Sequence, residues 1–220
     1  MFVIKVMLSF KYHFLFYLQL MNALSIATYA GIFVFAITGA LKARTHKMDI
    51  FGALVLALIA AYGGGTLRDL LIGVRPVSWV NDNIALFLLV AATALTFFFK
   101  INFKQFRRTM FFTDAAGLGL FTITGIEKSL EFGINEEYAV IMGVITATFG
   151  DLISDVLCNE VPNLLKRGEL YATVSFIGGI IYVLLKHVPL EYNTNIIACV
   201  LIIVGIRIYS KRKRLLLPNI

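Results

Sequence analysis

Long apolar runs separated by short polar segments follow one another from residue 22 to residue 208. A helix needs about 20 apolar residues to cross the hydrocarbon core of a bilayer, and several of the runs approach or exceed that length. Strands of a membrane barrel would instead alternate over segments of about 10 residues. The pattern predicts an all-α, polytopic membrane bundle of seven transmembrane helices. The expected spans are 22–41, 48–72, 83–99, 113–126, 138–156, 170–185 and 194–208, the fourth being the shortest, with an earlier start at 110–112 left open.

The chain also matches itself when it is shifted by 86 residues. Residues 30–39 read AGIFVFAITG and residues 116–125 read AGLGLFTITG. In the same register Lys42, Gly64, Asp69 and Pro76 recur as Lys128, Gly150, Asp155 and Pro162. Each copy holds three spans, an odd number, so the second copy enters the membrane from the opposite face. Inverted repeats of this kind are an architecture of transporters and channels.

The predicted organisation is therefore two inverted three-helix repeats plus a seventh helix. We assign an N-terminal extension at 1–20, repeat 1 at 21–100, repeat 2 at 113–186, a seventh helix at 194–209 and a basic cytoplasmic tail at 210–220. Lys5 and Lys11 interrupt the apolar residues of the extension. We interpret it either as sequence upstream of a functional start at Met21 or as an interfacial helix.

Loop charges predict the orientation, because cations of short loops stay in the cytoplasm. One side of the membrane, which holds the loops after spans 1, 3 and 5 and the tail, has 14 lysines and arginines, whereas the other loops have three. Lys42 is counted with the first of these loops and Arg207 with the tail. The first span is thus expected to begin outside and the chain to end in the cytoplasm, in the plasma (inner) membrane.

Composition agrees with a membrane protein and narrows the partners. Apolar residues make up 59% of the chain and charged residues 15%, against about 45–50% and about 25% in soluble domains. The net charge is +7, but its cations lie in loops between apolar runs, which argues against nucleic acid and for the lipid bilayer. Cys158 and Cys199 are isolated, so we expect no metal site, no disulfide framework and no cofactor.

Glycines interrupt the second span. Gly63, Gly64 and Gly65 are consecutive, and each costs about 1 kcal/mol relative to alanine inside a helix. Backbone groups freed at such a point need water or protein partners, so broken membrane helices line polar cavities. We predict a break or kink at Gly63–65 and, through the repeat, at Gly150 in the fifth span. The alternative is that these glycines only allow close helix packing.

Charged residues inside the membrane usually mark a solute pathway. The candidates are Arg68, Asp69, Asp114, Asp151 and Asp155. Asp151 and Asp155 share a helix face because they are four residues apart, and Asp151 is expected to face water, an ion or a cationic partner. The simpler alternatives are an interfacial pair for Arg68 with Asp69, a cytoplasmic-end charge for Asp155 and a helix cap for Asp114.

These motifs resemble a known family. Residues 63–69 read GGGTLRD and are followed by Pro76 and Trp79, while residues 114–119 read DAAGLG. Over residues 22–209 the chain resembles the prokaryotic trimeric intracellular cation (TRIC) channels, whose bacterial members are often described as glycine-transporter-domain proteins. The resemblance implies a homotrimer with a pore in each protomer, in which the kinked second and fifth helices flank a path for monovalent cations, chiefly potassium.

One departure concerns the fifth span. Family members commonly carry a Gly-Gly pair and an Arg-Asp pair there, whereas this chain has Gly150-Asp151 and Ser154-Asp155. Replacing a cation and adding an anion makes that half of the path more negative, which favours cations.

Three functions are compared. The first is a potassium-permeable channel steered by Asp69, Asp151 and Asp155. The second is a glycine transporter, in which Asp151 binds the ammonium and amides freed at Gly63–65 bind the carboxylate. The third, an intramembrane aspartyl protease, requires a Gly-x-Gly-Asp segment that here reads Thr148-Phe149-Gly150-Asp151. Because the first glycine is missing, we do not expect an enzyme.

Overall fold

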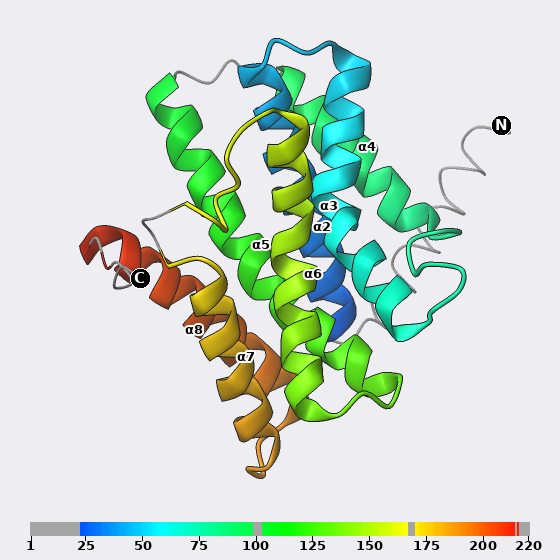
Figure 1. Cartoon of the computed structure of the whole chain (residues 1–220), viewed down its shortest axis with the longest axis vertical. Helices are drawn as coiled ribbons and strands as arrows, with labels where there is room; N and C mark the ends of the chain where they lie inside the picture. The colour runs from blue at the N-terminus through cyan, green and yellow to red at the C-terminus, as the bar shows by residue number, and fades with distance from the viewer. Residues whose placement is uncertain (1–22, 99–102, 167–169, 214, 216–220) are drawn as a thin grey trace, which may run out of the picture.

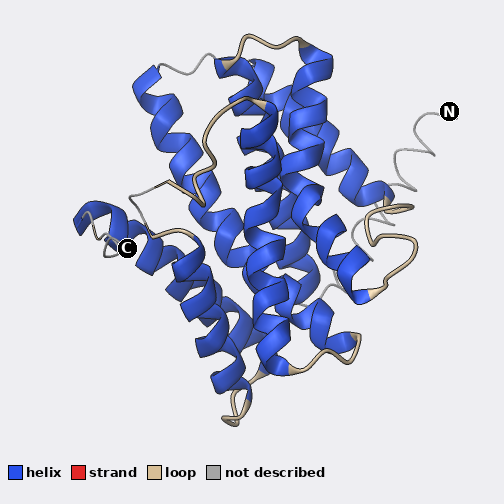
Figure 2. Cartoon of the chain, in the orientation of Figure 1, coloured by secondary structure: helices blue, strands red, loops and turns tan. Residues whose placement is uncertain are grey.

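The computed structural model describes residues 23–98, 103–166, 170–213 and 215, and over these ranges it contains helices and loops but no strand (Figures 1 and 2). The extension expected at 1–20 and much of the expected tail lie outside the described residues. The helices are α2 (Ala23–Thr45), α3 (Ile50–Ile72), α4 (Asn83–Phe98), α5 (Phe103–Glu131), α6 (Glu136–Leu157), α7 (Ala172–Lys186) and α8 (Tyr192–Lys213). Each corresponds to one predicted span, so the predicted seven-helix membrane bundle is confirmed.

Helix lengths differ from the expectation at two places. The fourth span is not the shortest, because α5 begins at Phe103 and its 29 residues make it the longest described helix. Its first turns are basic, so a rule based on apolar runs misses them. Five helices are long and apolar enough to cross a membrane, whereas α4 and α7 have only 16 and 15 residues. These two are the third helices of their repeats, so the short length is itself repeated.

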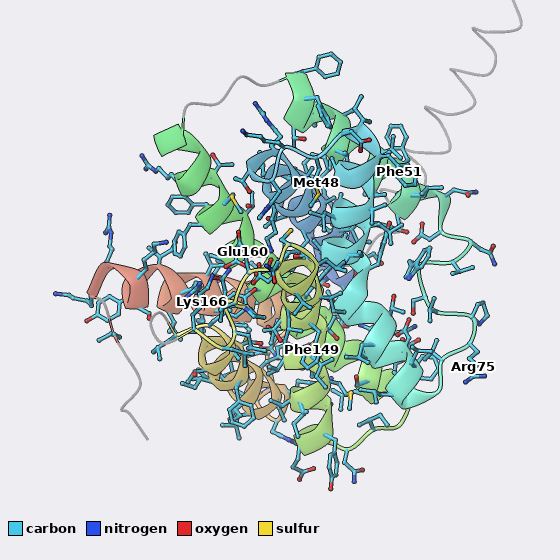
Figure 3. All side chains as sticks on the ribbon, turned by 45° about the horizontal axis from the view of Figure 1, so that its top comes forward. Met48, Phe51, Arg75, Phe149, Glu160 and Lys166 are labelled. Carbon is cyan, nitrogen blue, oxygen red and sulfur yellow. The ribbon has the colours of Figure 1, made fainter. Side chains whose placement is uncertain are left out.

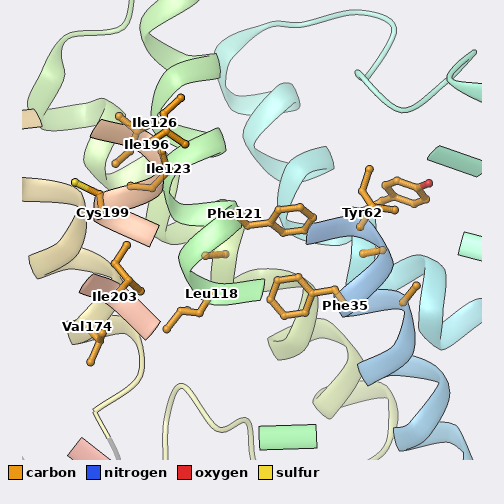
Figure 4. Close-up of a cluster of buried hydrophobic side chains, with 14 of the residues drawn as sticks. Phe35, Tyr62, Leu118, Phe121, Ile123, Ile126, Val174, Ile196, Cys199 and Ile203 are labelled. Atoms are coloured by element: carbon orange, nitrogen blue, oxygen red, sulfur yellow. The ribbon is translucent and has the colours of Figure 1, made fainter. Parts of the chain in front are cut away.

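The helices α2 and α5 pack together antiparallel through reciprocal contacts. A methyl group built on Gly31 would strike the ring of Phe121, and one built on Gly117 would strike the ring of Phe35. Gly117 and Phe121 are the repeat counterparts of Gly31 and Phe35, so each residue meets the counterpart of its partner. The two phenylalanine rings lie 5.1 Å apart between centroids (Figure 4). Such an exchange of partners is what a two-fold axis produces.

The second pair of equivalent helices, α3 and α6, repeats this arrangement. A methyl group on Gly64 would strike the carbonyl oxygen of Thr146, and one on Gly150 would strike that of Ala60. Residue numbers rise along α3 as their partners fall along α6, and the two helices run in opposite directions in Figure 1. Equivalent helices of opposite direction, related by a two-fold axis, are the inverted repeats expected from the sequence.

The ends of α3 and α6 also match. Gly73 ends α3 with φ of +81°, and its counterpart Asn159 follows α6 with φ of +56°. The next residue in each repeat donates a backbone hydrogen bond to an aspartate carbonyl, Val74 to Asp69 at 2.8 Å and Glu160 to Asp155 at 2.9 Å. These left-handed caps place Asp69 and Asp155 at opposite ends of the bundle.

Candidate ion pathway

The predicted glycines mark the place where α3 and α6 cross. A methyl group on Gly63 would lie 3.2 Å from the Cα atom of Gly150, so the two backbones approach more closely than side chains would allow. Both helices continue through these residues without a non-helical position, so neither helix is broken there, while a kink at Gly63–65 and Gly150 stays a prediction. Close packing of small residues, the alternative considered above, is the role that Gly63, Gly64 and Gly150 have here.

On one side of the crossing lies a cavity of about 240 Å³, which we call the cavity end. Its walls come from α2, α3, α4, α5 and α6 together with the loop after α3. Gly65 faces it, because the nearest atom to a methyl group built there is Arg68 Nη2 at 3.8 Å. The polar and aromatic lining residues are Ser25, Thr28, Tyr62, Arg68, Asp69, Ser78, Trp79, Asp82, Phe121, Thr124, Lys128, Glu131 and Thr146.

The charged groups of this cavity are held by neighbours. Arg68 Nη2 lies 2.7 Å from Asp69 Oδ1, and the other carboxylate oxygen of Asp69 accepts from the backbone nitrogen of Ser78 at 2.6 Å. Both residues are largely buried, Arg68 at 7% exposure and Asp69 at 1%. The pair is therefore an internal feature of the cavity wall and not a headgroup-facing pair. Arg75, farther along the loop, projects away from the bundle (Figure 3).

The other side of the crossing, which we call the lysine end, contains a buried ion cluster. Lys42 Nζ lies 2.7 Å from Asp151 Oδ1, 2.7 Å from Ser154 Oγ and 2.5 Å from Asp155 Oδ1. Lys42, Asp151 and Asp155 are all less than 5% exposed. The remaining oxygen of Asp155 accepts from the backbone nitrogen of Asn163 at 2.9 Å. Asp151 thus has the cationic partner that its position in the membrane requires.

A second polar group lies beside this cluster. Asp114 is the twelfth residue of α5 and does not cap it, contrary to the alternative considered above. Its carboxylate accepts from Tyr171 at 2.9 Å and lies 3.5 Å from Arg207 Nη2. Arg207 also donates to the carbonyl oxygen of Leu170 at 2.8 Å and stacks over the Tyr171 ring. Helix α8, the last of the seven described helices, therefore contributes the buried cation Arg207 to the lysine end.

The predicted site residues divide between the two ends. Gly65, Arg68 and Asp69 line the cavity, while Asp114, Asp151 and Asp155 gather at the lysine end. Sequence reasoning missed the two cations that hold the second group, because it counted Lys42 as a loop residue and Arg207 as part of the tail. The recurrence of Lys42 as Lys128 was the signal that could have singled it out.

The comparisons with known proteins agree with this architecture. A family model described as "Glycine transporter" matches twice, at residues 25–100 and 111–187, and the two starts are 86 residues apart. A membrane protein of Vibrio cholerae, named UPF0126, is 39% identical over 190 residues, which cover 86% of this chain and 79% of the relative. The inner membrane protein YadS of Escherichia coli K12 is 38% identical over 193 residues, covering 86% and 92%.

Comparison with solved structures also finds membrane proteins of similar fold. A TRIC trimeric intracellular cation channel orthologue from Rhodobacter sphaeroides superposes with a TM-score of 0.81 at 33% identity, covering 87% of this chain and 98% of that chain. The chain belongs to the TRIC family. A second TRIC structure, from work on conductance through TRIC cation channels, gives a TM-score of 0.79 at 35% identity over 89% and 96% of the two chains. As a TRIC family member, this protein is an integral membrane protein, and its resemblance noted from the glycine motif is confirmed.

Proposed function

We propose that this TRIC protein is a channel for monovalent cations, chiefly potassium, with a path inside each protomer of a homotrimer. The observation that carries the proposal is the α3–α6 crossing with ionisable groups on both sides of it. The related structure from Rhodobacter sphaeroides is described as a trimeric intracellular cation channel orthologue. Lys42 with Asp151 and Asp155 leaves a formal charge of −1 at the lysine end, and a negative path favours cations.

In this proposal a cation enters the cavity past Arg68 and Asp69, passes the glycine crossing and reaches Asp151 and Asp155. A change of direction of α3 at Gly63–65 and of α6 at Gly150 widens the crossing during conduction. The lysine end faces the cytoplasm, because the loops on that side carry most of the basic residues. The first transmembrane helix then begins outside.

The test is a flux assay on purified protein in liposomes, comparing potassium, sodium and glycine. Potassium flux above that of empty liposomes, with slower sodium flux and no glycine uptake, is the expected result. Saturable glycine uptake without potassium flux would instead establish the glycine transporter, the alternative that the mixed charges of the cavity also suit.

The position of the path is tested by modification of a cysteine at Gly65. In a background with Cys158 and Cys199 replaced by alanine, both native positions being buried, Gly65→Cys is treated with a charged methanethiosulfonate reagent. We expect potassium flux to fall several-fold, because the attached group fills the cavity. Gly205→Cys in α8 is the matched control, since a Cβ atom there meets nothing within 4 Å. Full labelling at Gly65→Cys with unchanged flux would contradict the proposed path.

A further inference from the structure

The two lysines related by the repeat are in different states. Lys42 lies in the last turn of α2, is 4% exposed and contacts three oxygens from α6. Its counterpart Lys128 lies at the same position of α5, where its side chain is 31% exposed and pairs with Glu131 at 3.2 Å. Lys128 lines the open cavity. Equivalent residues thus close one end of the bundle and leave the other open.

The partners of the lysines explain the difference. Asp151 has Gly65 as its counterpart, and Ser154 has Arg68. Lys42 therefore contacts two carboxylates and a hydroxyl, and these three groups without the lysine carry a formal charge of −2. A lysine moving into the equivalent place at the cavity end would meet Asp69 already bound to Arg68, with a formal charge of zero.

Electrostatics then forbids the mirror-image state. Two unit charges 4 Å apart interact by about 4 kcal/mol at the effective dielectric constant of a protein surface. Lys128 at the place equivalent to that of Lys42 would be repelled by the Arg68 guanidinium, and Asp69, the counterpart of Asp155, is already paired with Arg68 there. The cavity end therefore cannot form an ion cluster equivalent to the one at the lysine end.

We propose that the pathway has a single gate, formed by Lys42 on Asp151 and Asp155 at the lysine end, and that the cavity end stays open. This inference rests on the proposed function and deepens it. When Lys42 is in place, its ammonium occupies the carboxylates that a permeating cation needs. When the side chain extends along α2, which ends three residues later at Thr45, the ammonium reaches the headgroups and water.

A one-sided gate decides between two kinds of transport. A carrier with inverted repeats closes its two ends in turn by exchanging the conformations of the repeats. This chain has lost the symmetry that the exchange requires, at Gly65 against Asp151 and at Arg68 against Ser154. Opening the lysine end, together with the widening of the glycine crossing, therefore gives a continuous path, which is the behaviour of a channel.

The experiment compares Lys42→Gln with Lys128→Gln in the liposome flux assay. Minor states of two-state proteins are commonly populated at about 0.1–10%, so removal of the gate should raise potassium flux by roughly tenfold or more. Lys128→Gln removes a cation from the cavity wall but opens no gate, so its flux should rise much less than that of Lys42→Gln. Wild-type flux in a folded Lys42→Gln protein, or an equal rise in Lys128→Gln, overturns the single gate.

Folding is controlled by a second variant. Lys42→Gln leaves two buried carboxylates without their cation, whereas Lys42→Gln with Asp155→Asn restores the wild-type formal charge of −1. This double variant should also conduct faster than the wild type, and wild-type flux in it counts against the gate. The outcomes remain distinct from a failure of the proposed function, in which the wild type and all variants pass no more potassium than empty liposomes.

Discussion

Arg207→Leu is expected to lower the free energy of unfolding by about 3–5 kcal/mol, because it removes one partner of a buried ion pair. Asp114 would keep only its hydrogen bond from Tyr171, and the carbonyl oxygen of Leu170 would lose its donor. For a chain of this size the loss corresponds to a decrease of roughly 10 °C in the melting temperature. Thermal unfolding of the purified protein in detergent measures it.

The matched control is Arg212→Leu, five residues later on α8 at an exposed position. It removes the same charge from the same helix and should leave the free energy of unfolding within about 0.5 kcal/mol of the wild-type value. Adding Asp114→Asn to Arg207→Leu should recover part of the loss, since the neutral amide needs no cation. Equal melting temperatures for Arg207→Leu and Arg212→Leu would show that the ion pair does not stabilise the bundle.

Gly64→Ala is expected to destabilise the protein by about 1–3 kcal/mol, the usual cost of overpacking. The new methyl group would strike the carbonyl oxygen of Thr146, which is backbone and cannot rotate away. Separation of α3 and α6 is the only relief, and it disturbs the crossing on which the proposed path depends. Both the melting temperature and the potassium flux should therefore change.

Gly65→Ala is the control, one residue farther along the same helix. Its methyl group meets only Arg68 Nη2 at 3.8 Å, and alanine is about 1 kcal/mol more favourable than glycine in a helix. This variant should be as stable as the wild type or more stable. Gly150→Ala should resemble Gly64→Ala, because its methyl group meets the carbonyl oxygen of Ala60. Equal stability of Gly64→Ala and Gly65→Ala would contradict the role assigned to the crossing.

The sequence predicted the parts of this structure that depend on local pattern and on self-similarity. Apolar runs located all seven helices, and the 86-residue register identified the pairs of residues that exchange partners across the two-fold axis. The start of α5 was missed because its first turns are basic, so helix and apolar run do not coincide. An apolar run therefore predicts where a helix lies in the membrane better than it predicts where that helix begins or ends.

The candidate site was predicted only in part, for a physical reason. Lys42 and Asp151 are 109 residues apart, and Arg207 and Asp114 are 93 apart, so no local pattern pairs them. A lysine at the end of an apolar run has the same appearance in sequence whether it extends to water or folds back onto a carboxylate. The glycine triplet was ambiguous in the same way, since a helix break and a helix crossing require the same small residues.

Because Gly31, Phe35, Gly117 and Phe121 exchange partners, the packing of one half of the bundle depends on side-chain size in the other half. A larger side chain at either glycine needs a smaller ring in the opposite half, so these four positions change together or not at all. Positions without reciprocal contact are free of that constraint. The halves differ at places such as Gly65 with Asp151 and Arg68 with Ser154, where a difference changes the chemistry of the two ends without disturbing this packing.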